Sequence, residues 1–174
     1  MVSAVTIRQL NELDDMECLT KVVHAAYAQL GSSGLRFWGT HQSVDDTRSR
    51  CADGLCFVAL VDGRIVGTVT VKPPESDSKV EIYRDAFTWS LVQFAVLPDY
   101  KGAGIGKQLH DAAVNAAISQ GARRVALDTA VPATHLIAMY ERWGYAIAAE
   151  CDWRPFTNYA SVVMTRHVAP DTTS

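Results

Sequence analysis

The hydrophobic and polar positions follow two different periods along the chain, which predicts strands and helices mixed in one domain. Apolar residues at helical spacing predict a first helix that Asn11 can cap and that extends to about residue 30. The same spacing predicts helices over residues 105–120 and 133–143, and Ser43 with Asp46 forms a capping box for a short helix that stops near residue 53. Short apolar or alternating runs predict strands at residues 4–10, 55–61, 65–71, 88–97, 124–129, 145–153 and 159–166.

Turn residues then connect these elements. Asp62-Gly63 suits a type I′ turn, so residues 55–61 and 65–71 should form a hairpin. Residues 80–85 fit either a short strand or one helical turn. The strand–helix–strand unit from residue 88 to residue 129 should place its two strands parallel, with a right-handed crossover.

Composition and charge narrow the class of protein. The chain has 174 residues, of which 48% are hydrophobic and 20% charged, as in one ordinary globular domain. A formal charge of −3 gives no electrostatic reason to expect a nucleic-acid partner. We find no secretory signal and no apolar run of the roughly 20 residues that span a bilayer, so we expect a cytoplasmic protein without a membrane partner. The four scattered cysteines are interpreted as reduced structural thiols, and no metal site is indicated.

The most informative stretch is Leu91–Gln108, LVQFAVLPDYKGAGIGKQ, which predicts a strand, a glycine-rich loop and the start of a helix. Its glycines leave the backbone nearly bare, so a ligand can approach the main-chain N–H groups. These N–H groups would open a helix, whose unpaired donors and positive dipole end favour an anion. Lys101 and Lys107 flank the loop and add charge. The stretch therefore predicts a pocket for phosphate, most simply a pyrophosphate.

Three known phosphate loops compete for this stretch. A P-loop would need glycine where Lys101 stands and Ser or Thr where Gln108 stands. A dinucleotide loop needs G-x-G-x-x-G, whereas the spacing here is G-x-G-x-G. Lys101, Gly104 and Gly106 fit the third pattern, Q/R-x-x-G-x-G/A, with lysine in place of Gln or Arg. From residue 92 to residue 145, the chain resembles the GCN5-related N-acetyltransferase (GNAT) superfamily, and the remaining elements agree with that family in order.

The resemblance implies a fold of the α/β (α+β) class, a single domain over residues 1–174 with a polar tail at about 169–174. Its central sheet is mixed, mostly antiparallel and of about seven strands, with about four flanking helices. The strands at 88–97 and 124–129 would be parallel and splay apart, and pantetheine would lie between them. The cofactor-binding residues implied for acetyl-CoA are Phe94, Ala95, Val96, Lys101, Gly102, Ala103, Gly104, Ile105, Gly106 and Lys107.

The resemblance also implies a catalytic acid. Tyr140 lies in AMYERWGY, which looks like the family segment Y-E-x-x-G-F/Y, where the tyrosine hydroxyl protonates the departing thiolate of coenzyme A. A phenol with a pKa of about 10 stays protonated at neutral pH and can donate to such a thiolate. The alternative is a packed aromatic residue of an amphipathic helix, but the position of Tyr140 and its spacing to Gly144-Tyr145 favour the catalytic role. Many family members carry Asn where this chain has Ala133, so that cofactor contact must be absent or come from Thr134 or His135.

A base must also deprotonate the attacking amine. Asp128, at the end of the predicted strand 124–129, is the first candidate, although it could instead pair with an arginine or cap a turn. The other candidates are Glu81, His41 and His135. The family's acceptor pocket offers aromatic residues here, which suit a partly apolar or cationic small acceptor but could equally be core residues: Phe37, Trp38, Trp153 and Tyr159.

Together these features predict transfer of the acetyl group of acetyl-CoA to a primary amine of a small molecule, by direct attack in a ternary complex. Two alternatives stay open within the same fold: a longer acyl group or a protein N-terminus or lysine as acceptor, and a non-catalytic acyl-CoA sensor. The resemblance is also compatible with a homodimer.

Overall fold

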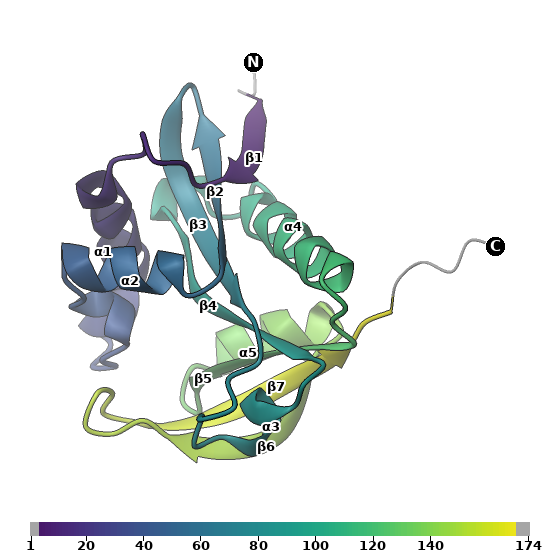
Figure 1. The fold of residues 1–174 in the computed structure, drawn as a ribbon. Helices are drawn as coiled ribbons and strands as arrows, with labels where there is room; N and C mark the ends of the chain where they lie inside the picture. The colour runs from purple at the N-terminus through teal and green to yellow at the C-terminus, as the bar shows by residue number, and fades with distance from the viewer. Residues whose placement is uncertain (1–3, 170–174) are drawn as a thin grey trace.

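A computed structural model describes residues 4–169, which fold around one seven-stranded sheet of order β1-β2-β3-β4-β5-β7-β6 (Figure 1). The β4–β5 pair is parallel and the other neighbouring pairs are antiparallel. This confirms the predicted mixed sheet and its splayed parallel pair. The strands are β1 (Val5–Gln9), β2 (Leu55–Val61), β3 (Arg64–Lys72), β4 (Thr88–Val96), β5 (Arg124–Ala130), β6 (Ala146–Asp152) and β7 (Ala160–His167).

The described residues form five α-helices rather than about four, because the ambiguous segment 80–85 contains one helical turn. The helices are α1 (Met16–Ser32), α2 (Val44–Ala52), α3 (Glu81–Arg84), α4 (Ile105–Ser119) and α5 (Thr134–Arg142), with 3₁₀ turns η1 (Trp38–Thr40) and η2 (Pro98–Tyr100). Within residues 4–169, no helix is both long and apolar enough to cross a membrane. Residues 170–174 of the predicted polar tail lie outside the described range.

The helices cover both faces of the sheet. In Figure 1, α1 and α2 lie on one side of β2–β4, and α4 lies on the other. The largest core cluster lies on the side of the sheet that α4 and α5 cover, and Leu109 and Ala113 of α4 are fully buried there, where the helix packs mainly against β2 and β3. On the opposite face, Leu19 of α1 packs against Val58 of β2. Small residues along α4 let its backbone approach the sheet closely, and this holds the N-terminus of α4 beside the end of β4.

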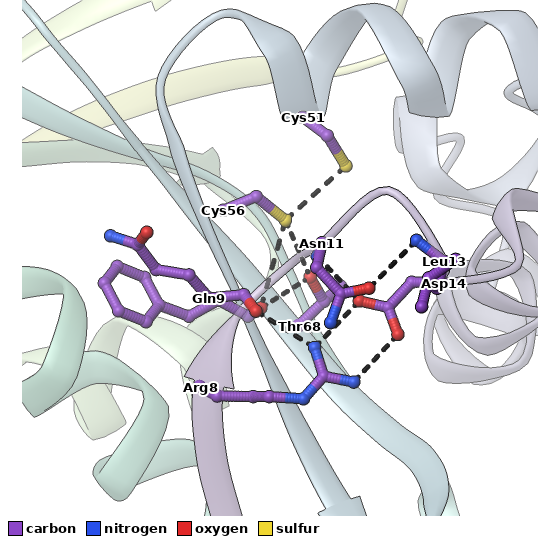
Figure 2. A network of polar contacts seen from close by, with 9 residues as sticks. Arg8, Gln9, Asn11, Leu13, Asp14, Cys51, Cys56 and Thr68 are labelled. Carbon is purple, nitrogen blue, oxygen red and sulfur yellow. Dashed lines mark hydrogen bonds and ion pairs between the residues drawn. The ribbon is translucent and has the colours of Figure 1, made fainter.

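The connection from β1 to α1 differs from the sequence prediction. Asn11 does not cap the helix, because its Oδ1 accepts a hydrogen bond from the Leu13 amide within a local turn. Arg8 forms two hydrogen bonds of 2.8 Å with the Asp14 carboxylate and fixes this turn (Figure 2). The helix therefore begins at Met16, and Asp15 caps it instead. Near the same turn, the Cys51 and Cys56 sulfurs approach to 3.5 Å (Figure 2).

The Asp62-Gly63 turn and the α2 capping box form as predicted. Asp62 and Gly63 both have positive φ, as a type I′ turn requires. The Ser43 hydroxyl accepts a hydrogen bond from the Asp46 amide, while the Asp46 carboxylate accepts one from the Ser43 amide. This box begins α2 at Val44, and it therefore sets the direction in which the helix runs past the sheet.

Candidate active site

A cavity opens where β4 and β5 separate. The two strands pair over only three positions, Thr88–Ser90 with Arg124–Ala126, although β4 continues to Val96. Beyond this point a cavity of about 570 Å³ is lined by β4 residues on one side and by Leu127 and Asp128 of β5 on the other. Its wall is completed by α1, η1, α2, α3 and α5 and by the β3–α3 and β6–β7 loops. The strand splay thus produces a site at the centre of the sheet.

A β-bulge in β4 shapes one wall of this cavity. The register with β3 shifts between Thr68 and Thr70, and Gln93 adopts a left-handed φ of 52°. A left-handed conformation at a non-glycine residue costs free energy and persists only where surrounding contacts hold it. Here the Tyr27 hydroxyl donates a 2.7 Å hydrogen bond to the Phe94 carbonyl oxygen, and the Gln93 side chain is buried in a polar network. The bulge turns the backbone out of regular pairing in the segment expected to contact pantetheine.

The predicted cofactor residues of β4 divide between the cavity and the core. Phe94 lines the cavity. The Ala95 side chain packs against α1, and the Val96 side chain packs in the core beside α4. Any contact that Ala95 or Val96 makes with a cofactor must therefore use the main chain, as the resemblance implies.

The glycine-rich loop ends in an uncapped helix N-terminus. Gly104 is the N-cap of α4, and no side chain satisfies the first amides of the helix. The hydrogen bond from the Gln108 amide to the Gly104 carbonyl is 3.1 Å long, so the amides of Ile105, Gly106 and Lys107 precede it. Gly102 and Gly104 both have positive φ and open space where a side chain would project. These amides and this space fit a phosphate group.

The other residues of the loop differ in what they offer. Lys101, Gly102 and Ala103 are exposed, whereas the Ile105 side chain is buried in the core and can offer only its amide. Lys107 forms a 2.6 Å ion pair with Asp111, and its ammonium lies 5.8 Å from the centroid of the Trp143 ring. The loop residues 101–107 lie outside the lining of the central cavity, at the α4 end of β4.

Tyr140 reaches the cavity from α5. Its ring packs edge to face on Trp143 and Tyr145, and burial raises the pKa of the phenol above its ordinary value. A raised pKa keeps the hydroxyl protonated. Among residues 4–169, no hydrogen-bond partner occupies the Tyr140 hydroxyl. The hydroxyl is therefore available as a donor to a group bound in the cavity.

Asp128 faces the cavity from the end of β5. Its two carboxylate oxygens accept hydrogen bonds from the Tyr83 hydroxyl at 2.5 Å and from the Trp153 indole N–H at 3.0 Å. Burial raises the pKa of Asp128, while these hydrogen bonds partly oppose the rise. A carboxylate with a raised pKa is a better proton acceptor than an ordinary aspartate.

The other predicted bases lie outside the cavity, whereas the predicted acceptor residues line it. Glu81, His41 and His135 are exposed and do not line the cavity. Thr134 is exposed as well, and Ala133 is buried at the start of α5. All four predicted acceptor aromatics line the cavity: Phe37, Trp38, Trp153 and Tyr159.

Several polar residues of the cavity were missed by the sequence reasoning, and three of them matter for the chemistry. Arg50 of α2 faces the cavity, Tyr83 of α3 supports Asp128, and Lys72 of β3 forms a 2.5 Å ion pair with Glu75. Arg50 stands two residues from the exposed Arg48 on a polar helix, so periodicity could not separate them. Tyr83 lies in the segment that fitted either a strand or a helical turn. Among the described residues, no cluster of three or more His, Cys, Asp or Glu could hold a metal ion.

Comparison with known sequences agrees with this geometry. Residues 21–145 match the model of the acetyltransferase (GNAT) family. The chain is 31% identical to S-(2-succino)cysteine N-acetyltransferase of Bacillus subtilis (strain 168), over 79% of this chain and 82% of the relative. It is 26% identical to S-alkylcysteine N-acetyltransferase of the same strain, over 83% of this chain and 80% of the relative.

Comparison with solved structures agrees on the fold. The PaiA N-acetyltransferase of Thermoplasma acidophilum, solved in complex with coenzyme A, has a TM-score of 0.71 to this chain at 18% identity. The match covers 95% of this chain and 99% of that structure. At this identity the likeness concerns the arrangement of the strands and helices.

Proposed function

This chain belongs to the acetyltransferase (GNAT) family, and from that premise we propose that it acetylates the primary amine of a small molecule by direct attack in a ternary complex. It is an acetyl-CoA-dependent N-acetyltransferase. The observation that carries the proposal is the cavity between β4 and β5, because Tyr140 and Asp128 both line it. An acid and a base are both needed when an amine attacks a thioester.

Acetyl-CoA would be held by main-chain groups. The amides that begin α4, together with those of residues 102–104, would bind the pyrophosphate, since they are uncapped and face open space. The backbone of Phe94–Val96, which begins in the bulge and then pairs with β3, would bind pantetheine. Both contacts use backbone, so the surrounding side chains can pack in the core at the same time. Lys101 and Lys107 add positive charge near the pyrophosphate.

The chemistry would then divide between two side chains. Asp128, with its raised pKa, would accept a proton from the acceptor ammonium, directly or through water. The free amine attacks the thioester carbonyl, so that a C–N bond forms and the C–S bond breaks. The Tyr140 hydroxyl would donate its proton to the departing thiolate. No covalent intermediate on the protein is required, because amine and thioester are bound together.

The acceptor is proposed to be small and partly apolar. The two relatives that match most of the chain act, by their names, on S-substituted cysteines, whose side chains are thioethers. Trp38, Trp153 and Tyr159 give the cavity apolar surface on which such a side chain could pack. This favours a small amine over a protein lysine. The cytoplasmic location and the homodimer predicted from the sequence are kept as proposals.

Thiol release from acetyl-CoA, measured with a panel of primary amines, tests the proposal. The panel contains S-methyl-L-cysteine, S-methyl-L-cysteinamide, an aliphatic monoamine, a lysine-containing peptide and a peptide with a free N-terminus. We expect turnover with at least one small amine and little with the peptides. Stabilisation by acetyl-CoA without turnover on any amine would identify an acyl-CoA sensor instead.

Tyr140→Phe tests the acid in the same assay. We expect kcat to fall by about 10²-fold or more, because general acid catalysis contributes that much, while the Kd for coenzyme A stays within about twofold. The ring contacts with Trp143 and Tyr145 are retained by phenylalanine, so the fold should be unchanged. An unchanged kcat would remove Tyr140 from the mechanism.

A further inference from the structure

Arg50 is a cation of the cavity that forms no ion pair with another described residue. Its Nη1 donates a 2.7 Å hydrogen bond to Oε1 of Gln42, and its guanidinium lies 4.7 Å from the centroid of the Trp38 ring. Within residues 4–169, no carboxylate lies within ion-pair distance of it. A guanidinium has five N–H donors, so most of them remain available. Arg50 is partly buried, and burial lowers its pKa, although the charges of Asp128 and Asp46 oppose this effect.

The fold holds the Arg50 guanidinium in a fixed orientation. Gln42 is fully buried, and its Nε2 donates to the Thr47 hydroxyl at 2.7 Å and to the Gln93 side chain at 2.8 Å. Both amide hydrogens are thus used, and Oε1 is left to accept from Arg50. Gln93 belongs to the bulge of β4. The position of Arg50 is therefore linked to the strand that lines the cofactor side of the cavity.

The other charged groups that line the cavity either have partners or, like Asp77, are exposed. Lys72 lies 2.5 Å from Glu75 and 3.9 Å from Asp53. Asp128 accepts hydrogen bonds from Tyr83 and Trp153. Lys79 is exposed, donates to the Asp152 carbonyl and lies over the Trp153 ring. Arg50, in contrast, is partly buried in the cavity lining, and most of its guanidinium N–H groups have no partner among the described residues.

We propose that Arg50 binds a carboxylate adjacent to the acceptor amine, so that the preferred acceptor is an α-amino acid. This rests on the proposed function and deepens it, because it names the substrate class and the residue that selects it. Arginine is suited to this role because its planar fork matches both oxygens of a carboxylate. In an α-amino acid, the amine and the carboxylate are attached to the same carbon. With the carboxylate bound to Arg50, the amine would therefore lie in the same cavity as Asp128, the proposed base.

The carboxylate would also relieve the cost of a poorly solvated charge. An unpaired cation in a partly buried site is unfavourable, and a bound anion compensates it. An acceptor with a neutral amide at this position would leave Arg50 without a direct carboxylate partner. A protein N-terminus is such an acceptor, because its first α-carbon carries a peptide group. Arg50 therefore discriminates free amino acids from peptides.

The test compares S-methyl-L-cysteine with S-methyl-L-cysteinamide, in which an amide replaces the carboxylate. Thiol release from acetyl-CoA is measured with each acceptor for the wild type, Arg50→Met and Arg50→Lys. The amide has the less basic amine and is more often deprotonated at neutral pH, so chemistry alone favours the amide. We expect the wild type to prefer the acid, and Arg50→Met to lower kcat/KM for the acid by about thirtyfold or more with little change for the amide.

Two comparisons separate recognition from folding. Arg50→Lys keeps the charge but loses the fork, and should restore only part of the preference. Arg48→Met, on the same helix, removes an exposed arginine paired with Asp45 and should leave both rates unchanged. Binding of S-methyl-L-cysteine to the complex with coenzyme A, measured by calorimetry, should be lost in Arg50→Met and retained in Arg48→Met.

The outcomes distinguish this inference from the proposed function. A wild type that acetylates the amide as well as the acid, or that prefers an amine without an adjacent carboxylate, overturns the role of Arg50 and leaves the acetyltransferase function standing. A wild type that acetylates no amine contradicts both. An equal loss for acid and amide in Arg50→Met would show a structural role and would also overturn the inference.

Discussion

Replacing Asp128 with asparagine separates its proposed catalytic role from a structural one. The side chain has the same shape, so its oxygen can accept the hydrogen bond from Trp153 while its amide donates to the Tyr83 hydroxyl. Both contacts persist, and we expect the free energy of unfolding to change by only about 1 kcal/mol. Asparagine cannot accept a proton. Losing a general base lowers the rate by about 10²- to 10⁴-fold, or about 2.7–5.4 kcal/mol in activation free energy.

The pH dependence of kcat/KM provides the assay. A base acts in its deprotonated form, so wild-type activity falls as the pH drops through the raised pKa of Asp128. Asp128→Asn lacks this decline and keeps only the dependence on deprotonation of the acceptor amine. Asp45→Asn is the matched control, because Asp45 is exposed and pairs only with Arg48. An Asp128→Asn rate within about threefold of the wild type, with an unchanged pH profile, would refute the reasoning.

The same raised pKa has a consequence for stability. The folded chain binds a proton at Asp128 more tightly than the unfolded chain, whose aspartates titrate near pKa 3.9. The Asp128 contribution therefore favours folding at low pH and declines as the pH rises from about 3.9 to the pKa in the folded state. Asp128→Asn should lack this decline in urea titrations.

Two further predictions concern the helix α4. Gly104→Asn and Gly104→Asp place similar side chains at the same left-handed position, with φ of 80°, so both carry similar backbone strain. Calorimetry should show that the Asp variant binds coenzyme A at least about tenfold more weakly than the Asn variant, and equal affinities would contradict a phosphate site there. Burial lowers the pKa of His110, whose ring contacts Tyr145 and Asp111, so its contribution to stability is present above about pH 6.5 and declines as the pH falls below it. The Tm should drop more between about pH 7 and pH 5 for the wild type than for His110→Gln, and parallel curves would exclude His110 as the cause.

The local sequence predicted much of this fold because most elements have strong local signals. The hairpin follows from Asp62-Gly63, the α2 start follows from its capping box, and the α4 N-terminus follows from the glycine loop. Asn11 misled the prediction because Asp15 is an equally good cap, and the Arg8–Asp14 ion pair decided between them. That ion pair joins β1 to the following turn and is a contact between side chains that periodicity does not describe.

The sequence identified those residues of the candidate site that belong to a motif or lie at the end of a predicted strand. The cavity contains Tyr140 and Asp128, which the sequence singled out as acid and base. Arg50 and Tyr83 could not be found in this way, because tertiary contacts decide that these two side chains face the cavity. Arg50 depends on Gln42 and on the bulge of β4, and the single turn of α3 depends on packing against β5 and β7.

Product analysis tests the central claim most directly. The full chain is incubated with acetyl-CoA and S-methyl-L-cysteine, the released thiol is quantified, and the amine product is identified by mass spectrometry. We predict one released coenzyme A thiol for each acetyl group found on the α-nitrogen. Binding of acetyl-CoA with no acetylated product from this acceptor or from any other amine of the panel would contradict the account.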